Sequence, residues 1–158
     1  MRLKEAVFVY AISLVSIFPL SLYAQAPAPS ETSQAITEQE ARKFLDEYIA
    51  QYRRMDVDAF MALFSKEAIE NRMIPYADIY EIYRKNFSNS NSLSYNLRVY
   101  FVQPYAGNAF VSGRYELVQS LKPKGQQNVF RGNIQWGLVR EDGSLKIIKI
   151  DYGRDRMR

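Results

Sequence analysis

The segment NIQWGLVREDGSLKIIKIDYG, residues 133–153, carries more information about the fold than any other part of the chain. Ile134, Trp136 and Leu138 alternate with other residues, which is the period of a strand with one buried face. Asp142-Gly143 is typical of a two-residue hairpin turn, and residues 145–152 form the expected closing strand. The segment therefore predicts a β-hairpin with one apolar face.

The strands that precede this hairpin show the same period of two. Residues 97, 99 and 101 and then 111, 115 and 117 are apolar or aromatic and are separated by polar residues, so they predict two more strands. Phe130 begins the inward-facing set of the hairpin, with Gly132 expected as a bulge or bend. The run SNSNS, residues 88–92, predicts a loop because short polar side chains compete for backbone hydrogen bonds.

The first half of the domain has the helical period instead. Thr37 and Glu40 form a capping box, and the apolar stripe behind them predicts a helix of about four turns. Asp56 is expected to cap a second, shorter helix, and Pro75 suits the first turn of a third. Residues 65–73 leave room for a short strand or a turn. The order of elements predicts an α+β fold with three helices on one face of a curved sheet.

The N-terminus resembles a secretory signal. A short basic region is followed by an apolar run, residues 6–20, and then by small residues at Ala24 and Ala26. We expect cleavage after Ala24, because a cut after Ala26 would place a proline next. Residues 1–24 are thus interpreted as a signal peptide, residues 25–35 as a flexible leader, residues 36–153 as the domain and residues 154–158 as a basic tail. The prediction is an exported protein, periplasmic or extracellular in a bacterium, that meets a membrane only through the signal segment before cleavage.

Composition excludes several kinds of chemistry. The sequence has no Cys and no His, so disulfides, thiolate or imidazole metal sites and Ser-His-Asp triads are excluded. We expect no metal and no cofactor. Removing residues 1–24 takes two basic residues and one acidic residue from a net charge of +4, which leaves +3. This mild and dispersed charge is unlike that of a nucleic-acid-binding domain. Any catalysis would use carboxylate, tyrosine, lysine or arginine side chains.

Two stretches resemble the nuclear transport factor 2-like superfamily, also called SnoaL-like. The stretch YRRMDVDAFMALFSKEA, residues 52–68, is similar to the junction between the first two helices and the first strand, and residues 133–153 are similar to the terminal hairpin. The resemblance covers residues 36–153, is strongest to the bacterial envelope type, and implies a cone-shaped fold that encloses a pocket. Ketosteroid-isomerase-like members use an Asp base with Tyr and protonated Asp as oxyanion donors. Dehydratase-like members pair His with Asp, a pairing that this chain does not have.

The sequence contains 12 Tyr and 9 Phe, which favours an amphipathic interior. We predict a pocket for a small apolar or amphipathic ligand. Its lining would come from the three helices, the sheet and the terminal hairpin: Tyr48, Tyr52, Phe64, Tyr80, Tyr83, Phe101, Tyr115 and Trp136. Tyr76 shares the predicted stripe of the third helix with Tyr80 and Tyr83 and could also line the pocket. The alternative interpretation is a packed core whose phenols reach its rim.

Two further groups of residues have both a functional and a structural interpretation. Asp151 would be a proton acceptor at the pocket mouth, or it would lie on the outer face beside Lys149. Periodicity favours the outer face, because Ile148, Ile150 and Tyr152 fall on the other one. Glu116 is the one acid that the pattern places within a strand. We expect it to lie on the outer face of the sheet together with four other residues: Arg98, Tyr100, Arg114 and Arg131. This face is a predicted interaction surface for a second copy of the chain or for an envelope protein.

Three functions remain open at this point. The first is an exported, non-enzymatic binding or interaction domain with a tyrosine-lined pocket. The second is a small-molecule isomerase or dehydratase-like enzyme that uses a carboxylate and a tyrosine. The third is an envelope-assembly subunit that dimerises through its sheet. An acid inside the cone, within hydrogen-bond reach of a tyrosine, would favour the enzyme.

Overall fold

The computed structural model describes residues 35–155. The predicted signal peptide, nearly all of the leader and the last three residues of the basic tail lie outside this part. The elements follow in this order: α1 (Glu38–Arg54), α2 (Val57–Met61), β1 (Phe64–Glu70), β2 (Ile74–Pro75), α3 (Tyr76–Ser88), β3 (Ser90–Tyr105), β4 (Asn108–Leu121), β5 (Gln127–Glu141) and β6 (Ser144–Tyr152). No helix in residues 35–155 is both long enough and apolar enough to cross a membrane.

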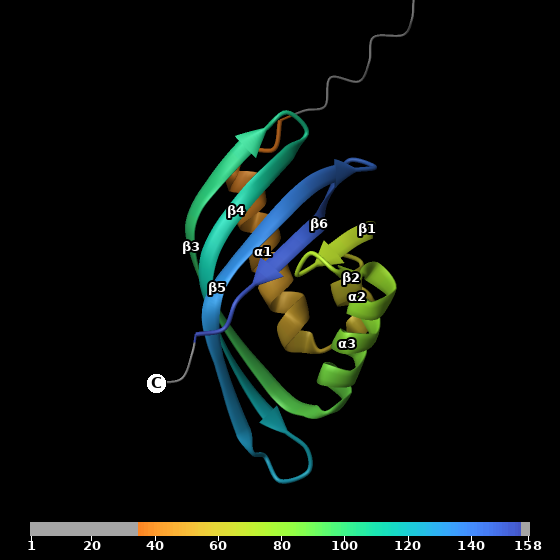
Figure 1. The fold of residues 1–158 in the computed structure, drawn as a ribbon, viewed down its shortest axis with the longest axis vertical. Helices are drawn as coiled ribbons and strands as arrows, with labels where there is room; N and C mark the ends of the chain where they lie inside the picture. Colours follow the sequence, from red (N-terminus) through yellow and green to blue (C-terminus); the bar gives the residue numbers. More distant parts are fainter. Residues whose placement is uncertain (1–34, 156–158) are drawn as a thin grey trace, which may run out of the picture. The chain divides into compact units, whose positions relative to one another are not determined.

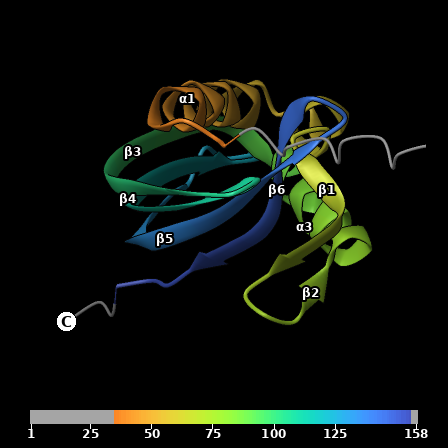
Figure 2. The same ribbon diagram turned by 90° about the horizontal axis from the view of Figure 1, so that it is seen from above.

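The strands form one six-stranded sheet in the order β2-β1-β6-β5-β4-β3. Strands β3 to β6 are an antiparallel meander, as predicted, while β1 joins the sheet parallel to β6. The sheet is strongly curved, with α1 over the β3–β5 part and α3 beside β1 (Figures 1 and 2). This is the predicted α+β architecture of helices on the inner face of a curved sheet.

The first helix begins where the capping box predicts. The Thr37 hydroxyl accepts a hydrogen bond from the Glu40 backbone N–H, and the Glu40 carboxylate accepts one from the Thr37 backbone N–H. Glu40 also pairs with Arg140 at the end of β5, with 2.8 Å between the atoms. The Thr37 backbone N–H and then Arg140 lower the pKa of Glu40 to about 2. The cap therefore also ties the start of α1 to the sheet.

The space between helices and sheet is filled mostly by aromatic rings. Phe60 of α2 is at the centre, 4.8 Å from Tyr83 and 5.1 Å from Tyr48 between ring centroids. Tyr52 lies 5.0 Å from Tyr95 of β3, and many of these rings meet edge to face, as aromatic quadrupoles favour. The core is thus built from large flat side chains, several of which carry a hydroxyl group.

The prediction of a loop at residues 88–92 is wrong. Helix α3 ends at Ser88 and β3 begins two residues later. Ser90 is buried, and its hydroxyl donates to the Asn86 carbonyl and accepts from the Gln119 side chain, at 2.6 and 2.8 Å. Pairing with β4 satisfies the backbone groups that would otherwise favour a loop, so tertiary contacts override the local preference.

Two bulges change which residues face the core. A register shift between Val99 and Phe101 turns Phe101 to the outer face, where 49% of it is exposed and it contacts Phe110. A second shift, at the β5–β6 pairing, leaves Ile147 and Ile150 inward instead of Ile148. A bulge inserts one extra residue and so reverses the alternation beyond it.

Gly132 is required for a different reason from the predicted bulge, because the β4–β5 pairing passes through it without a shift. A Cβ atom there would lie 1.7 Å from the Gly153 carbonyl oxygen. Residues 153–155 continue along β5 beyond β6, donating from the backbone N–H groups of Gly153 and Asp155 to the carbonyls of Asn133 and Arg131. Only glycine allows this close crossing.

Candidate functional site

A small cavity of about 70 Å³ opens among the aromatic rings. Its wall is formed by helices α1 and α3, strands β3 to β6 and the segment after β6. The lining residues are Tyr48, Tyr52, Tyr83, Tyr95, Tyr115, Leu117, Phe130, Ile134, Tyr152 and Arg154. Such a volume holds a few water molecules or a small organic molecule, and is below the roughly 300–1,000 Å³ of most drug-sized pockets.

Four residues of the predicted pocket line this cavity, namely Tyr48, Tyr52, Tyr83 and Tyr115. Two others lie behind it in the core. Phe64 packs against Phe60, with 5.3 Å between centroids, and Trp136 is fully buried with its ring edge-on to Tyr48 at 5.8 Å.

The remaining predicted pocket residues lie elsewhere. Tyr80 points away from the core and donates its hydroxyl hydrogen to Asp58 at 2.7 Å. Tyr76 accepts a hydrogen bond from Lys66, whose ammonium group also lies over its ring. Phe101 is on the outer face because of the bulge in β3. In α3, only the side that carries Ile79, Tyr83 and Phe87 is buried, so the predicted stripe does not face the core as a whole.

The most informative side chain at this site was not anticipated. Glu70, the last residue of β1, is 0% exposed, while its neighbour Ile69 is 44% exposed. The strand therefore turns its acid inward and its apolar residue outward, against the usual pattern. The chain also has an acid within a strand besides Glu116, contrary to expectation.

Glu70 and Tyr152 form a hydrogen-bonded pair next to the cavity. The Tyr152 hydroxyl donates to Glu70 Oε1 at 2.6 Å. Within residues 35–155, Glu70 Oε2 is buried and has no hydrogen-bond partner. Burial raises the pKa of Glu70, and the neighbouring hydroxyls of Tyr152 and Tyr83 oppose that shift without cancelling it. A carboxyl group in this environment can exchange a proton closer to neutral pH than an exposed one.

The surrounding phenols stay neutral. Burial raises the pKa of Tyr48 and Tyr83 well above the ordinary value, and it raises the pKa of Tyr52 and Tyr95 in the same direction. These tyrosines can therefore donate or accept hydrogen bonds, and they do not act as bases near neutral pH.

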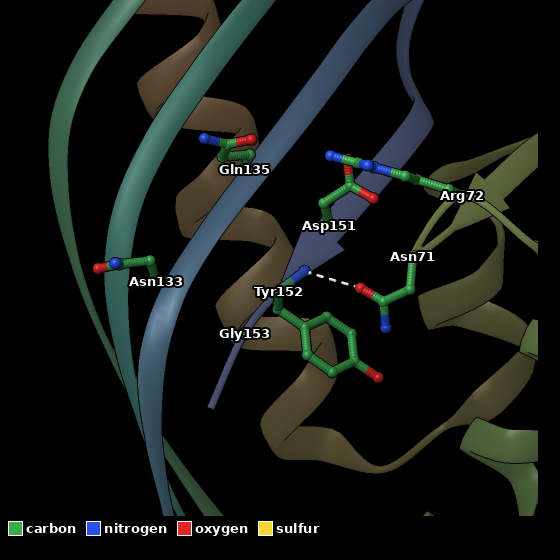
Figure 3. Close-up of a pocket in the computed structure, with 7 residues that line it drawn as sticks. All are labelled: Asn71, Arg72, Asn133, Gln135, Asp151, Tyr152 and Gly153. Atoms are coloured by element: carbon green, nitrogen blue, oxygen red, sulfur yellow. Dashed lines mark hydrogen bonds between the residues drawn. The ribbon is translucent and has the colours of Figure 1, made fainter. Parts of the chain in front are cut away.

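Asp151 lies on the other side of the sheet from this cavity. Its carboxylate is 3.0 Å from the Lys149 ammonium group, and it shares an open groove of about 340 Å³ with Asn71, Arg72 and Gln135. Figure 3 shows the Tyr152 ring directed away from the Asp151, Arg72 and Gln135 side chains, while the Tyr152 backbone N–H donates to Asn71 Oδ1 at 2.9 Å. Asp151 and Tyr152 of β6 thus point to opposite faces of the sheet.

The predicted interaction residues lie together on the outer face of β3, β4 and β5. Arg98, Arg114, Glu116 and Arg131 line a shallow groove of about 350 Å³. Glu116 pairs with Arg131, whereas Arg114 pairs with Asp155 of the C-terminal segment. Tyr100 is at the nearby bulge and is 50% exposed. A role in binding a second copy or an envelope protein stays a prediction.

In residues 35–155, no three Asp or Glu side chains come together in a way that could hold a metal ion. The acid–base groups of this site are the Glu70 carboxyl group and the tyrosine hydroxyls.

Comparison with known proteins identifies the fold. No protein-family model matches the chain, and no curated protein matches its sequence. Among solved structures, a ketosteroid isomerase-like protein from Erwinia carotovora atroseptica is 16% identical with a TM-score of 0.63, over 77% of this chain and 100% of that one.

Two further structures are similar to the same extent. A nuclear transport factor 2-like superfamily protein from Salmonella enterica serovar Typhimurium is 17% identical, with a TM-score of 0.63, over 75% of this chain and 91% of that one. A provisionally assigned scytalone dehydratase from Novosphingobium aromaticivorans is 11% identical, with a TM-score of 0.65, over 75% and 83%. The chain therefore has the nuclear transport factor 2-like fold that the sequence predicted. Fold alone does not determine an activity.

Proposed function

We propose that the protein binds a small molecule in the tyrosine-lined cavity and that Glu70 is the principal polar group of that site. The observation that carries the proposal is the buried Oε2 atom of Glu70, which has no partner among residues 35–155 and lies behind a wall that includes six tyrosines. Ligand sites combine apolar walls with a few convergent polar groups in this way.

Stability alone does not account for Glu70. A buried polar atom without a partner costs about 1–3 kcal/mol, and more when it is charged. An apolar residue of similar size would avoid this cost, since the buried cluster between the helices and the sheet is apolar or aromatic. Proteins tend to keep such locally unfavourable residues at functional sites. A ligand that satisfied Glu70 would recover part of the cost.

The cavity volume limits the ligand to a few non-hydrogen atoms unless the mouth moves. Arg154 is the exposed residue of the cavity wall and so marks its mouth, with its guanidinium 4.4 Å from the centroid of the Phe130 ring. Arg154 is exposed and follows the last strand, so displacing it would disturb little of the core. The starting probes should therefore be four-carbon molecules.

The test is an NMR titration of the full chain with labelled tyrosine rings. The probes are butan-1-ol, butan-2-one, butylammonium and butyrate, which share a chain length and differ in charge and hydrogen bonding. At least one probe is expected to shift the Tyr52, Tyr83 and Tyr152 signals in a saturable way. Leu117→Phe, which fills the cavity, should abolish the shifts, while Val129→Phe on an exposed position should not. Absence of a cavity shift with all four probes would overturn the proposal.

A second candidate function, proton transfer on a small carbonyl compound, is favoured by the 2.6 Å bond between Tyr152 and Glu70. Tyr152 lines the cavity and Glu70 lies behind it. The Tyr152 oxygen would take a proton from the carbon next to the carbonyl while its own proton passes to Glu70. The substrate becomes an enolate, and a neutral tyrosine hydroxyl would donate to its oxygen. The ketosteroid-isomerase-like resemblance implies the same class of chemistry.

Deuterium exchange separates the two candidates. Wild-type protein in D₂O should speed exchange of the α-hydrogens of butan-2-one if proton transfer occurs, and Glu70→Gln should remove that acceleration. Asp151→Asn is the matched control, because its carboxylate lies in the outer groove. Saturable binding of butan-2-one without accelerated exchange would leave binding as the function.

A further inference from the structure

Two hydrogen-bond acceptors lie at one end of the cavity, the Tyr152 oxygen in its wall and Glu70 Oε2 behind that wall. A phenol has one hydrogen to donate, and Tyr152 gives its hydrogen to Glu70 Oε1. The lone pairs of the Tyr152 oxygen therefore stay available, and Glu70 Oε2 is a second acceptor that has no partner in the part of the chain that the structure describes. A ligand that satisfies this end must be a donor.

The interior also contains an ionisable acid without a buried positive partner within residues 35–155. Glu70 is the only charged residue that is fully buried among residues 35–155. Arg154 is the cation that lines the cavity, but it is exposed and stacks on Phe130 at the mouth. An ionised carboxylate in a low-dielectric interior is strongly stabilised by a cation close to it.

The walls suit a cation as well. Six tyrosines surround the cavity: Tyr48, Tyr52, Tyr83, Tyr95, Tyr115 and Tyr152. Aromatic faces attract cations through the ring quadrupole, and the effect is larger where water is excluded. Rings that pack tightly also exclude the large hydration shell of a metal ion, so an organic cation with an apolar tail fits better.

We propose that the cavity binds the ammonium group of a small amine, with N–H donors directed to Glu70 and Tyr152 and the alkyl part against the tyrosine rings. This inference rests on the proposed binding function and names the chemical class of its ligand. It assigns to Glu70 the role of counter-ion for the ligand.

Binding should then depend on pH through Glu70. The groups nearest its carboxyl group are the hydroxyls of Tyr152 and Tyr83, with Tyr52 and Tyr48 beyond them, and burial raises the pKa of all four. The pKa of Glu70 is itself raised, and an alkylammonium ion stays charged at every pH below about 10. Ionised Glu70 attracts the cation, so affinity should increase as the pH rises through the pKa of Glu70.

The test compares butylammonium with butan-1-ol in the full chain, at pH 4.5 and pH 8, by titration of the tyrosine ring signals. The alcohol has the same length and one donor but no charge. At pH 8 butylammonium should bind at least tenfold more tightly, and this preference should shrink at pH 4.5. Glu70→Gln should remove the preference at pH 8, and Asp151→Asn should retain it.

Three other results of these titrations would each contradict one part of the proposal. If the alcohol binds as tightly as butylammonium at pH 8, the cation inference fails while small-molecule binding stands. If no four-carbon probe shifts the ring signals, the binding function fails with it. Tetramethylammonium has charge but no N–H donor, so binding equal to that of butylammonium would contradict the donor role. The wild-type comparison is decisive even if Glu70→Gln does not fold.

Discussion

The two faces of the sheet treat charge in opposite ways. Inside the cone, Glu70 is fully buried, and one of its oxygens has no partner among the described residues 35–155. On the outer face, charges reach solvent and are paired with opposite charges, as for Glu116 with Arg131 and Asp151 with Lys149. Paired charges in contact with solvent favour solubility and cross-strand pairing. The inner arrangement weakens the fold, which is why we place the function there.

The largest contrast should appear in the aromatic side chains of the two faces. Phe60→Ala removes the ring that packs against Tyr48 and Tyr83 and should lower the free energy of unfolding by about 3–5 kcal/mol. Phe101→Ala on the outer face should cost less than about 1 kcal/mol. Urea denaturation of both variants measures the difference. Equal losses would mean that the outer pair of Phe101 and Phe110 is a buried contact in solution.

The next contrast concerns two phenol–carboxylate hydrogen bonds of similar length. Tyr152→Phe removes the only hydrogen bond to Glu70 Oε1 within the described residues and should cost about 1–3 kcal/mol at pH 8. Tyr80→Phe removes the exposed bond to Asp58 and should cost no more than about 0.5 kcal/mol. Thermal and urea unfolding of the pair provide the measurement. A negligible cost at Tyr152 would show that water already reaches Glu70.

Glu70 should also determine how stability changes with pH. Its folded-state pKa is raised by burial above the ordinary value of 4.5, so the folded state holds the proton more tightly than the unfolded state. Its contribution to stability is therefore fully present below about pH 4.5 and is lost as the pH rises through the folded-state pKa. Glu70→Gln should remove this loss and make the protein more stable than the wild type at pH 8.

Asp151→Asn is the control for that measurement and should leave the pH dependence of unfolding unchanged. Denaturant midpoints at several pH values between 4 and 8 compare the variants with the wild type. A Glu70→Gln variant that is less stable than wild type at pH 8 would show that Glu70 is a structural acceptor.

The smallest expected effect is on the outer face. A double-mutant cycle of Glu116→Ala and Arg131→Ala should give a coupling energy of about 0.2–1 kcal/mol, because both partners are exposed. The coupling should decrease in high salt. A larger coupling that persists in salt would indicate that this face is covered in solution, and it would revive the predicted interaction surface.

The fold could be predicted from the sequence because its signals are local. The Thr37 and Glu40 capping box, the Asp142-Gly143 turn and the inward set around Trp136 each depend on spacings of a few residues, and the structure has all three. The candidate site could be predicted only in part. Tyr48, Tyr52 and Tyr83 follow from helical periodicity.

The rest of the site depends on distant parts of the chain. Bulges at β3 and β6 are set by pairing with neighbouring strands, so alternation in the sequence misplaced Phe101 and Ile148. Glu70 was missed because the pattern of β1 alone puts the more apolar Ile69 inside. Its inward orientation follows from the pairing of β1 with β6, a strand about 80 residues later in the chain.

The most direct test of the account is a crystal structure of the protein soaked with the four-carbon probes. The account predicts ordered probe density inside the cone, within hydrogen-bond distance of Tyr152 or Glu70 and surrounded by Tyr52 and Tyr83. Probe density confined to the outer grooves, with Glu70 satisfied by another side chain inside a filled core, would contradict it.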